Sequence, residues 1–148
     1  MSSKTYEKIL SANDVGKNGG HQGGVCVPKA NQDLISFFPT LDASRINPDA
    51  WIECIDPNNR PWRMRYIYYN GKLHGKSTRN EYRITHMTKF FREWNADEGD
   101  SLLFEETDLA CVYRVAVRSD KDRDECNDAR PKNPPVIILK SHNWNRIH

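Results

Sequence analysis

The residues best suited to acting on another molecule are concentrated in one stretch, Tyr68 to Thr85 (YYNGKLHGKSTRNEYRIT). Its ten central residues, Asn70 to Arg79, include three basic side chains, one histidine and two glycines, but no acid. The side chains of a type that reads base edges are Lys72, Lys76, Arg79, Asn80, Glu81 and Arg83. Arginine or lysine pairs with guanine in the major groove, asparagine pairs with adenine, and glutamate accepts a hydrogen bond from cytosine. The stretch therefore predicts sequence-specific binding to DNA.

The segments on either side of this stretch have the pattern of β-strands. Trp62 to Tyr69 (WRMRYIYY) places an aromatic or apolar residue at every second position, and Glu81 to Thr85 is a second strand-like run. A period of two with one apolar face is typical of a strand that covers a core. We therefore expect a hairpin whose cationic tip extends away from a sheet.

Charge is distributed unevenly along the chain, although the formal net charge is only +2. Between Arg60 and Arg92 there are nine Lys or Arg residues and one acid, whereas between Glu93 and Asp128 there are twelve acids and four bases. This segregation predicts one face that attracts polyanions and another that repels them, unless both segments are simply solvated charge.

The rest of the chain predicts a single, mainly β domain. Two short amphipathic helices are expected at Ala30 to Phe38, which precedes Pro39, and at Met87 to Trp94. The strand-like segments are Thr5–Leu10, Gly24–Pro28, Trp51–Ile55, Trp62–Tyr69, Glu81–Thr85, Ser101–Phe104, Ala110–Arg118 and Val136–Lys140. Seven or so short strands with two helices indicate a seven-stranded open β-barrel or a sandwich, and a length of 148 residues fits one domain.

Composition argues against several classes of protein. No apolar run approaches the ~18 residues of a membrane helix, and the first ten residues lack the apolar core of a signal peptide. The four cysteines are scattered without a CxxC pair, which argues against a zinc site and a disulfide framework. The final residues, SHNWNRIH, have the character of a terminal tail. We expect a cytoplasmic protein that needs no metal or cofactor.

A second unusual segment lies near the N-terminus. Ser11 to Gly24 (SANDVGKNGGHQGG) holds five of the eight glycines, interleaved with Asn, Asp, His and Gln. Glycine permits close approach of the backbone to a ligand, so this segment is either a second recognition element or a flexible surface loop. It is not a phosphate-binding P-loop, because no Gly-Lys-Ser/Thr follows at the required spacing.

Four segments, taken in order, resemble one known family. They are Leu10–Gln22 (LSANDVGKNGGHQ), Asn47-Pro48, Tyr68–Asn70 (YYN) and Thr78–Thr85 (TRNEYRIT). Together they resemble the N-terminal effector domain of EcoRII-type restriction endonucleases, and the similarity covers roughly Lys8 to Thr85. The resemblance implies a DNA-binding pseudobarrel like the plant B3 domain, in which two arms grip the major groove, and it implies recognition of CCWGG, where W is A or T.

The resemblance also assigns residues to the two arms. The N-terminal arm would be Lys8 to Gly24 and the C-terminal arm Lys72 to Arg83. The DNA-binding residues implied are Lys8, Ser11, Asn13, Asp14, Lys17, Gly20, His21 and Gln22 in the first arm, and Lys72, His74, Lys76, Ser77, Thr78, Arg79, Asn80, Glu81, Tyr82 and Arg83 in the second.

Residue chemistry divides these positions into roles. Arg79 and Arg83 are candidates for guanine contacts, whereas Glu81 either accepts from cytosine N4 or forms a salt bridge that orients the arginines. Lys17, Lys72 and Lys76 are expected to contact phosphates, which gives affinity and register but no sequence preference.

Three departures from the EcoRII pattern bear on the target. The C-terminal arm is one residue longer near Ser77, Ile9 stands where an arginine is expected, and Tyr82 replaces a lysine. The implied target is therefore CCWGG or a related site in double-stranded DNA.

Two other functions remain open. His74, Lys76 and Glu81 nearly reproduce the HxKxxxxD motif of phospholipase D-type nucleases, in which a histidine attacks phosphorus. Alternatively, Tyr68, Tyr69 and Tyr82 beside the basic stretch would suit a β-barrel that binds nucleic acid non-specifically by stacking.

The expectation that we adopt is a single DNA-binding domain, residues 1–148, with no catalytic residue of its own. We expect it to be a monomer, excised from a longer bacterial restriction enzyme whose nuclease domain would lie C-terminal to it.

Overall fold

The computed structural model describes residues 3–16, 23–119 and 144–147. In this part of the chain the elements are the strands β1 (Thr5–Ile9), β2 (Val25–Val27), β3 (Asp49–Ile55), β4 (Pro61–Tyr69), β5 (Glu81–Thr85), β6 (Ser101–Glu106), β7 (Val112–Arg118) and β8 (Trp144–Arg146), and the helices α1 (Gln32–Phe37) and α2 (Thr88–Glu93).

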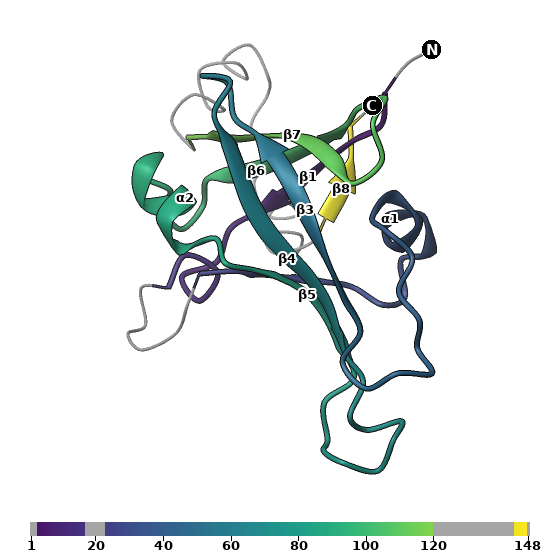
Figure 1. Ribbon diagram of the computed structural model, residues 1–148. Helices are drawn as coiled ribbons and strands as arrows, with labels where there is room; N and C mark the ends of the chain where they lie inside the picture. The colour runs from purple at the N-terminus through teal and green to yellow at the C-terminus, as the bar shows by residue number, and fades with distance from the viewer. Residues whose placement is uncertain (1–2, 17–22, 120–143, 148) are drawn as a thin grey trace, which may run out of the picture.

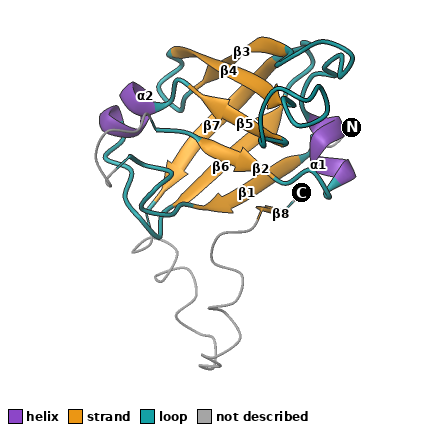
Figure 2. Cartoon of the chain, turned by 90° about the horizontal axis from the view of Figure 1, so that it is seen from below, coloured by secondary structure: helices purple, strands orange, loops and turns teal. Residues whose placement is uncertain are grey.

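All eight strands belong to one sheet, in the order β2-β5-β4-β3-β7-β6-β1-β8. Neighbouring strands are antiparallel except for β3 and β7, which run parallel. The sheet curves into an open barrel, with α1 and α2 at opposite sides of it (Figures 1 and 2). The mainly β barrel predicted from the sequence is confirmed, with eight strands in place of seven.

The period-two pattern of β4 places its apolar side chains in the core, as predicted. Met64, Tyr66 and Tyr68 are buried, and Tyr66 packs against Phe38 with ring centroids 5.0 Å apart. Phe38 follows α1, whose N-cap residue Asn31 accepts a hydrogen bond from the Leu34 N–H. Arg65 and Tyr69 consequently lie on the opposite face of the sheet, the face that also carries Glu81 and Arg83, and Ile67 on the same face is buried.

The predicted second helix is also confirmed. The α2 residues Phe90 and Phe91 are buried in the core, and Trp94, which ends the helix, packs against it. Neither helix in the described part of the chain has the length and apolar character needed to cross a membrane.

Residues 144–147 are not a loose tail, which corrects the sequence expectation for this part of the C-terminus. Trp144 begins β8, pairs with β1 at Lys8 and is only 6% exposed. Its indole N–H donates a 2.8 Å hydrogen bond to the carbonyl oxygen of Cys26 in β2. Because β2 and β8 are the two edges of the sheet, this bond links the edges across the opening of the barrel. The expected strand Val136–Lys140 lies outside the described residues.

Candidate DNA interface

The C-terminal arm, Lys72 to Arg83, is formed by the connection between β4 and β5 and by most of β5. Figure 1 shows this connection extending away from the body of the barrel, as predicted for the hairpin. Most of its side chains, including Lys72 and Lys76, are exposed. No carboxylate in the described ranges lies within ion-pair distance of either lysine. Both cations are therefore available to an anionic ligand.

The base of the arm is fixed by Asn70, which is fully buried. Its amide oxygen accepts from the Asn47 N–H at 2.7 Å, and its amide nitrogen donates to the carbonyl oxygens of Ala43 and Arg45. His74 adds a contact of 3.1 Å between its Nε2 and the same Ala43 carbonyl. The loop that precedes β3 therefore anchors the arm to the barrel.

The tip of the arm is folded around Gly71. The Gly71 carbonyl accepts from the N–H groups of His74, Lys76 and Ser77, and the Lys72 N–H donates to the carbonyl of Arg79 at 2.9 Å. A Cβ atom on Gly71 would lie 2.1 Å from Ser77 Oγ, so a larger residue would force the Ser77 side chain to move. A compact tip results, in which the backbone is held by its own hydrogen bonds.

Arg79 is held by two groups at the end of the hairpin. Its guanidinium lies over the ring of Tyr69, 3.7 Å from the centroid. Its Nε and one terminal nitrogen donate to Glu81 Oε1 at 3.2 and 2.8 Å. Tyr69 and Glu81 are directly paired across β4 and β5, which explains how both reach the same arginine.

The second oxygen of Glu81 has weaker partners. Oε2 lies 3.8 Å from Arg83 and accepts a long contact of 3.9 Å from the Cys26 thiol. Burial raises the pKa of this thiol, and the nearby Glu81 carboxylate raises it further. Glu81 therefore forms the predicted salt bridge with Arg79, while one of its oxygens keeps capacity for another donor.

Tyr82 is part of an aromatic stack and not a free surface residue. Its ring lies parallel to that of Tyr68, with centroids 4.2 Å apart. The centroid of the Tyr66 ring lies 5.8 Å from that of Tyr82. Burial raises the pKa of the Tyr82 hydroxyl, with a further contribution from Tyr68. The Tyr68 hydroxyl donates to Asn80 Oδ1 at 2.6 Å and so fixes the orientation of that amide.

The remaining predicted residues of this arm are Ser77 and Thr78. Both are exposed at its tip, and Ser77 Oγ accepts from the Arg79 N–H at 3.3 Å. Ser77 therefore has an internal role as well as an accessible position.

The N-terminal arm begins with an ordered turn. The Asp14 carboxylate accepts from the Ser11 N–H and from the Lys8 ammonium at 2.5 Å, while Asp14 N–H donates to Ser11 Oγ. Lys8 and Asp14 are both buried, whereas Asn13 is exposed. The four other predicted residues of this arm, Lys17, Gly20, His21 and Gln22, lie outside the described residues.

The return of this arm packs against β5 and α2. The Gly23 N–H donates to Thr88 Oγ1 at 2.7 Å, and the Gly24 N–H donates to the Asp14 carbonyl. A Cβ atom on Gly24 would lie 2.6 Å from the Ile84 carbonyl oxygen, so glycine allows the chain to enter β2 at this point. Both arms are therefore attached to β5, one at each end of the strand.

Comparison with known proteins identifies the family. Residues 1–105 match the sequence family described as "Restriction endonuclease EcoRII, N-terminal". The chain belongs to the EcoRII N-terminal domain family.

Two individual relatives are similar to this EcoRII-N chain. The type II restriction enzyme EcoRII of Escherichia coli is 41% identical over 88 residues, which cover 54% of this chain and 20% of that enzyme. A B3 domain-containing protein of rice (Oryza sativa subsp. japonica) is 27% identical over 141 residues, covering 93% of this chain and 31% of the relative. The chain thus matches between a fifth and a third of the length of these relatives.

Solved structures share the fold of the EcoRII-N chain. The Arabidopsis FUS3–DNA complex has a TM-score of 0.57 at 17% identity and covers 76% of this chain and 94% of that one. The complex of the Arabidopsis thaliana transcription factor LEC2 with DNA has a TM-score of 0.55 at 21% identity, covering 79% and 96%. The fold is therefore a B3-like pseudobarrel.

The groups that suggested a nuclease contact other partners. In the described part of this EcoRII-N chain, no hydrogen bond joins His74 to Lys76 or to Glu81: His74 contacts a carbonyl group and Glu81 binds Arg79. No cluster of His, Cys, Asp or Glu among the described residues could hold a metal ion.

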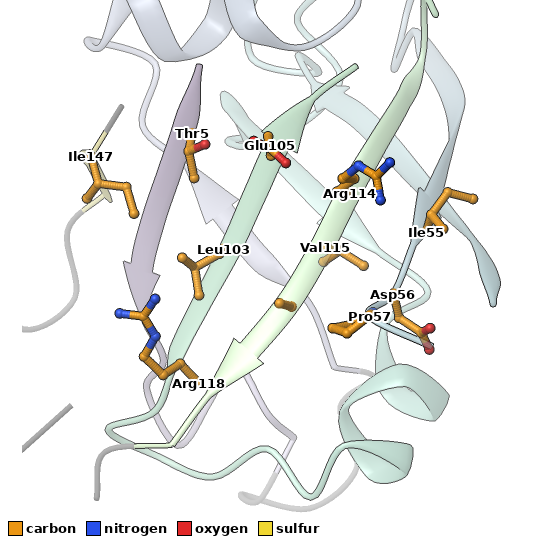
Figure 3. Close-up of a pocket in the computed structure, with 11 residues that line it drawn as sticks. Thr5, Ile55, Asp56, Pro57, Leu103, Glu105, Arg114, Val115, Arg118 and Ile147 are labelled. Carbon is orange, nitrogen blue, oxygen red and sulfur yellow. The ribbon is translucent and has the colours of Figure 1, made fainter. Parts of the chain in front are cut away.

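A hollow of about 330 Å³ lies elsewhere, on the outer face of β6 and β7 (Figure 3). Leu103, Val115 and Ala116 line it, with Arg114 and Arg118 at its edges. Neither histidine nor cysteine is among its lining residues, and the hollow shares no residue with the C-terminal arm. We assign it no part in the interface.

Sequence reasoning named Tyr69 only as a stacking residue of a non-specific nucleic-acid-binding barrel, and it did not select Asn70 or Gly71, although all three belong to the shared YYN-containing stretch or adjoin it. Strand register would have found Tyr69, because a hairpin that pairs Tyr68 with Tyr82 necessarily pairs Tyr69 with Glu81. The partners of Asn70 lie 23 to 27 residues earlier, at Asn47, Arg45 and Ala43, and no local pattern indicates them.

Proposed function

We propose that this chain binds double-stranded DNA sequence-specifically, with its two arms in the major groove. The observation that supports this most strongly is the row formed by Arg79, Glu81 and Arg83 on the outer face of the hairpin. An arginine held in a fixed orientation suits bidentate pairing with guanine O6 and N7, and a carboxylate suits the amino group of cytosine. Such a row favours a site rich in G·C pairs, as CCWGG is.

Glu81 can serve both roles that its chemistry allows. Oε1 orients Arg79, whereas Oε2, with only long contacts to Arg83 and Cys26, accepts from cytosine N4 in the proposal. A carboxylate placed near DNA without such partners would be repelled by the phosphates. The salt bridge therefore makes the acid compatible with an interface to DNA.

Other residues provide affinity without sequence preference. Lys72 and Lys76, both exposed, are proposed to contact phosphates, and Lys17 is proposed to do so from the other arm. Lys8 and Asp14, which are buried and paired with each other, are proposed to shape the N-terminal arm from within. His21 and Gln22 are the leading proposed contacts of that arm with DNA.

The aromatic residues do not favour a non-specific stacking platform. Tyr68 is 5% exposed, Tyr82 is stacked on it, and Tyr69 is covered by Arg79. Bases from a single strand would need an exposed ring face to stack on. Recognition of a duplex fits these side chains better.

Within a whole enzyme, we propose that the domain is the effector or target-recognition part of a bacterial type II restriction endonuclease acting on CCWGG or a related site. The 41% identity to EcoRII supports this role, and the matched region covers 20% of the length of EcoRII. Cleavage would then belong to a separate nuclease domain, and the domain described here would bind DNA as a monomer.

A gel-shift titration tests the proposal. A CCWGG duplex and a scrambled duplex of equal length are titrated at physiological salt without magnesium, and magnesium is then added. We expect a preference on the order of 10³-fold for CCWGG and no cleavage. Equal, salt-sensitive binding would contradict CCWGG recognition, and selection from a random duplex pool would then separate a different target from non-specific binding. Metal-independent cleavage that is lost in His74→Ala would support the nuclease instead.

A further inference from the structure

The residue behind Arg79 has no assigned role in recognition. Tyr69 is the last residue of β4, and its half-exposed side chain lies on the outer face of the sheet. It faces the same side as Glu81, its direct partner in β5. The arginine above it belongs to the proposed base-reading row, so Tyr69 is placed to influence that reading.

Tyr69 and Glu81 constrain Arg79 from two directions. The guanidinium carbon lies over the ring, 3.7 Å from its centroid, while Glu81 Oε1 binds the edge that contains Nε. The other terminal nitrogen has no hydrogen-bond partner among the described residues. The guanidinium has five N–H donors in a rigid fork, so three remain, and two of them lie on the edge formed by the two terminal nitrogens, which can make a bidentate contact with guanine.

This arrangement reduces the cost of binding. A free arginine side chain populates many rotamers, and ordering it at an interface costs conformational entropy. Glu81 alone fixes one edge of the fork but leaves the tilt of its plane free. The tyrosine ring supplies the missing constraint, because a cation is attracted to the face of an aromatic ring.

We propose that Tyr69 is a positioning residue for base recognition: its ring holds the guanidinium of Arg79 in the plane that reads a guanine edge. This inference rests on the proposed function of the arm. Tyr69 need not touch the DNA, and its effect passes through Arg79. Its hydroxyl is dispensable, because the ring face provides the contact.

Two substitutions separate the ring from the hydroxyl. Tyr69→Phe keeps the ring and is expected to bind the preferred duplex within about twofold of the unchanged protein. Tyr69→Leu removes the ring and is expected to lose roughly tenfold in affinity for that duplex, which corresponds to a cation–π contact of about 1.4 kcal/mol. Binding to a scrambled duplex and the dependence on salt should stay unchanged, because no phosphate contact is lost.

A double-mutant cycle shows whether the effect passes through Arg79. In an Arg79→Ala background, Tyr69→Leu is expected to cost nothing further, because the group it positions is already absent. A matched control is Trp51→Leu, which removes the ring beneath Arg63, a similar pair on the outer face of β3 and β4 with a distance of 4.8 Å. That substitution should leave binding unchanged.

The probe is the CCWGG duplex, or the duplex returned by selection from the random pool. If Tyr69→Leu weakens binding equally with and without Arg79, or weakens target and scrambled duplexes alike, the positioning role is wrong while the proposed function stands. If the unchanged protein prefers no duplex, both fail. Thermal melting of each variant shows whether a loss of folding explains a loss of binding.

Discussion

At the scale of single residues, the arm separates side chains that read sequence from side chains that only attract DNA. Glu81 belongs to the first kind, since its oxygens connect Arg79, Arg83 and the proposed cytosine contact. Changing Glu81 to Ala should reduce the difference in binding free energy between target and scrambled duplexes by about 1–3 kcal/mol, while the salt dependence of binding stays the same. Titration of target and scrambled duplexes at several salt concentrations measures both quantities. A variant that still prefers the target would show that Glu81 is only an internal salt-bridge partner.

Lys76 belongs to the second kind, the side chains that attract DNA without reading its sequence. It is exposed on the same arm and has no ion-pair partner in the described part of the chain. Changing it to Ala should weaken binding to all duplexes alike and lower the slope of log affinity against log salt by about one unit. Loss of preference for one base pair, with the slope unchanged, would instead make Lys76 a base reader.

At the scale of elements, the turn between β3 and β4 depends on one buried acid. Asp56, 1% exposed, accepts from the backbone N–H groups of Asn58 and Arg60 and from the indoles of Trp62 and Trp94. Burial acts to raise the pKa of this carboxyl, but the four donated hydrogen bonds outweigh burial and lower it. A lowered pKa means that folding favours the ionised form.

Because the pKa of Asp56 is lowered, the stability of the fold should depend on pH in the acid range. The stabilisation is present above the ordinary aspartate pKa of about 3.9 and is lost as pH falls through the lower folded value. Changing Asp56 to Asn should reduce the free energy of unfolding at pH 7 by about 2–4 kcal/mol, because an amide nitrogen cannot accept from an indole. Urea unfolding at pH 7, 4 and 3 should show the gap between the two proteins narrowing below about pH 4. A gap that stays constant would exclude this carboxylate as the cause.

Local elements were predictable from the sequence where apolar residues recur at the spacing of a strand or a helix that packs against the core. The alternation of Met64, Tyr66 and Tyr68 predicted β4, and the spacing of Phe90, Phe91 and Trp94 predicted α2. The arm itself followed from its charge and glycines. The supports behind it did not, because Asn70 is satisfied by a distant loop and Lys8 by a turn that buries it.

At the scale of the whole molecule, β8 shows why topology goes beyond local pattern. It has three residues, too few for a period, and it pairs with β1 at the other end of the chain. Only the curvature of the open barrel reveals that Trp144 belongs to the core, against Phe38 and Phe104.

Trp144, which links the two edges of the barrel, should contribute strongly to its stability. Trp144 packs against Phe38 and Phe104, and its indole N–H donates a hydrogen bond to the Cys26 carbonyl. Cys26 in turn lies beside Glu81 of the arm. Changing Trp144 to Ala should lower the free energy of unfolding by about 3–5 kcal/mol, since a large buried side chain is lost. Changing it to Phe should lower the free energy of unfolding through the smaller ring and by about 1 kcal/mol more, because the hydrogen bond is lost.

Urea unfolding measures both changes. The control is Ile147→Ala, which should cost little because Ile147 follows the last residue of β8 and is 37% exposed. Sequence preference of the Phe variant should survive, because the hairpin keeps its own hydrogen bonds and the row of Arg79, Glu81 and Arg83 is built within it. If the Phe variant stays folded but loses preference, the edge-to-edge link positions the arm as well as stabilising the barrel. If Trp144→Ala costs no more than Ile147→Ala, β8 does not close the barrel in solution.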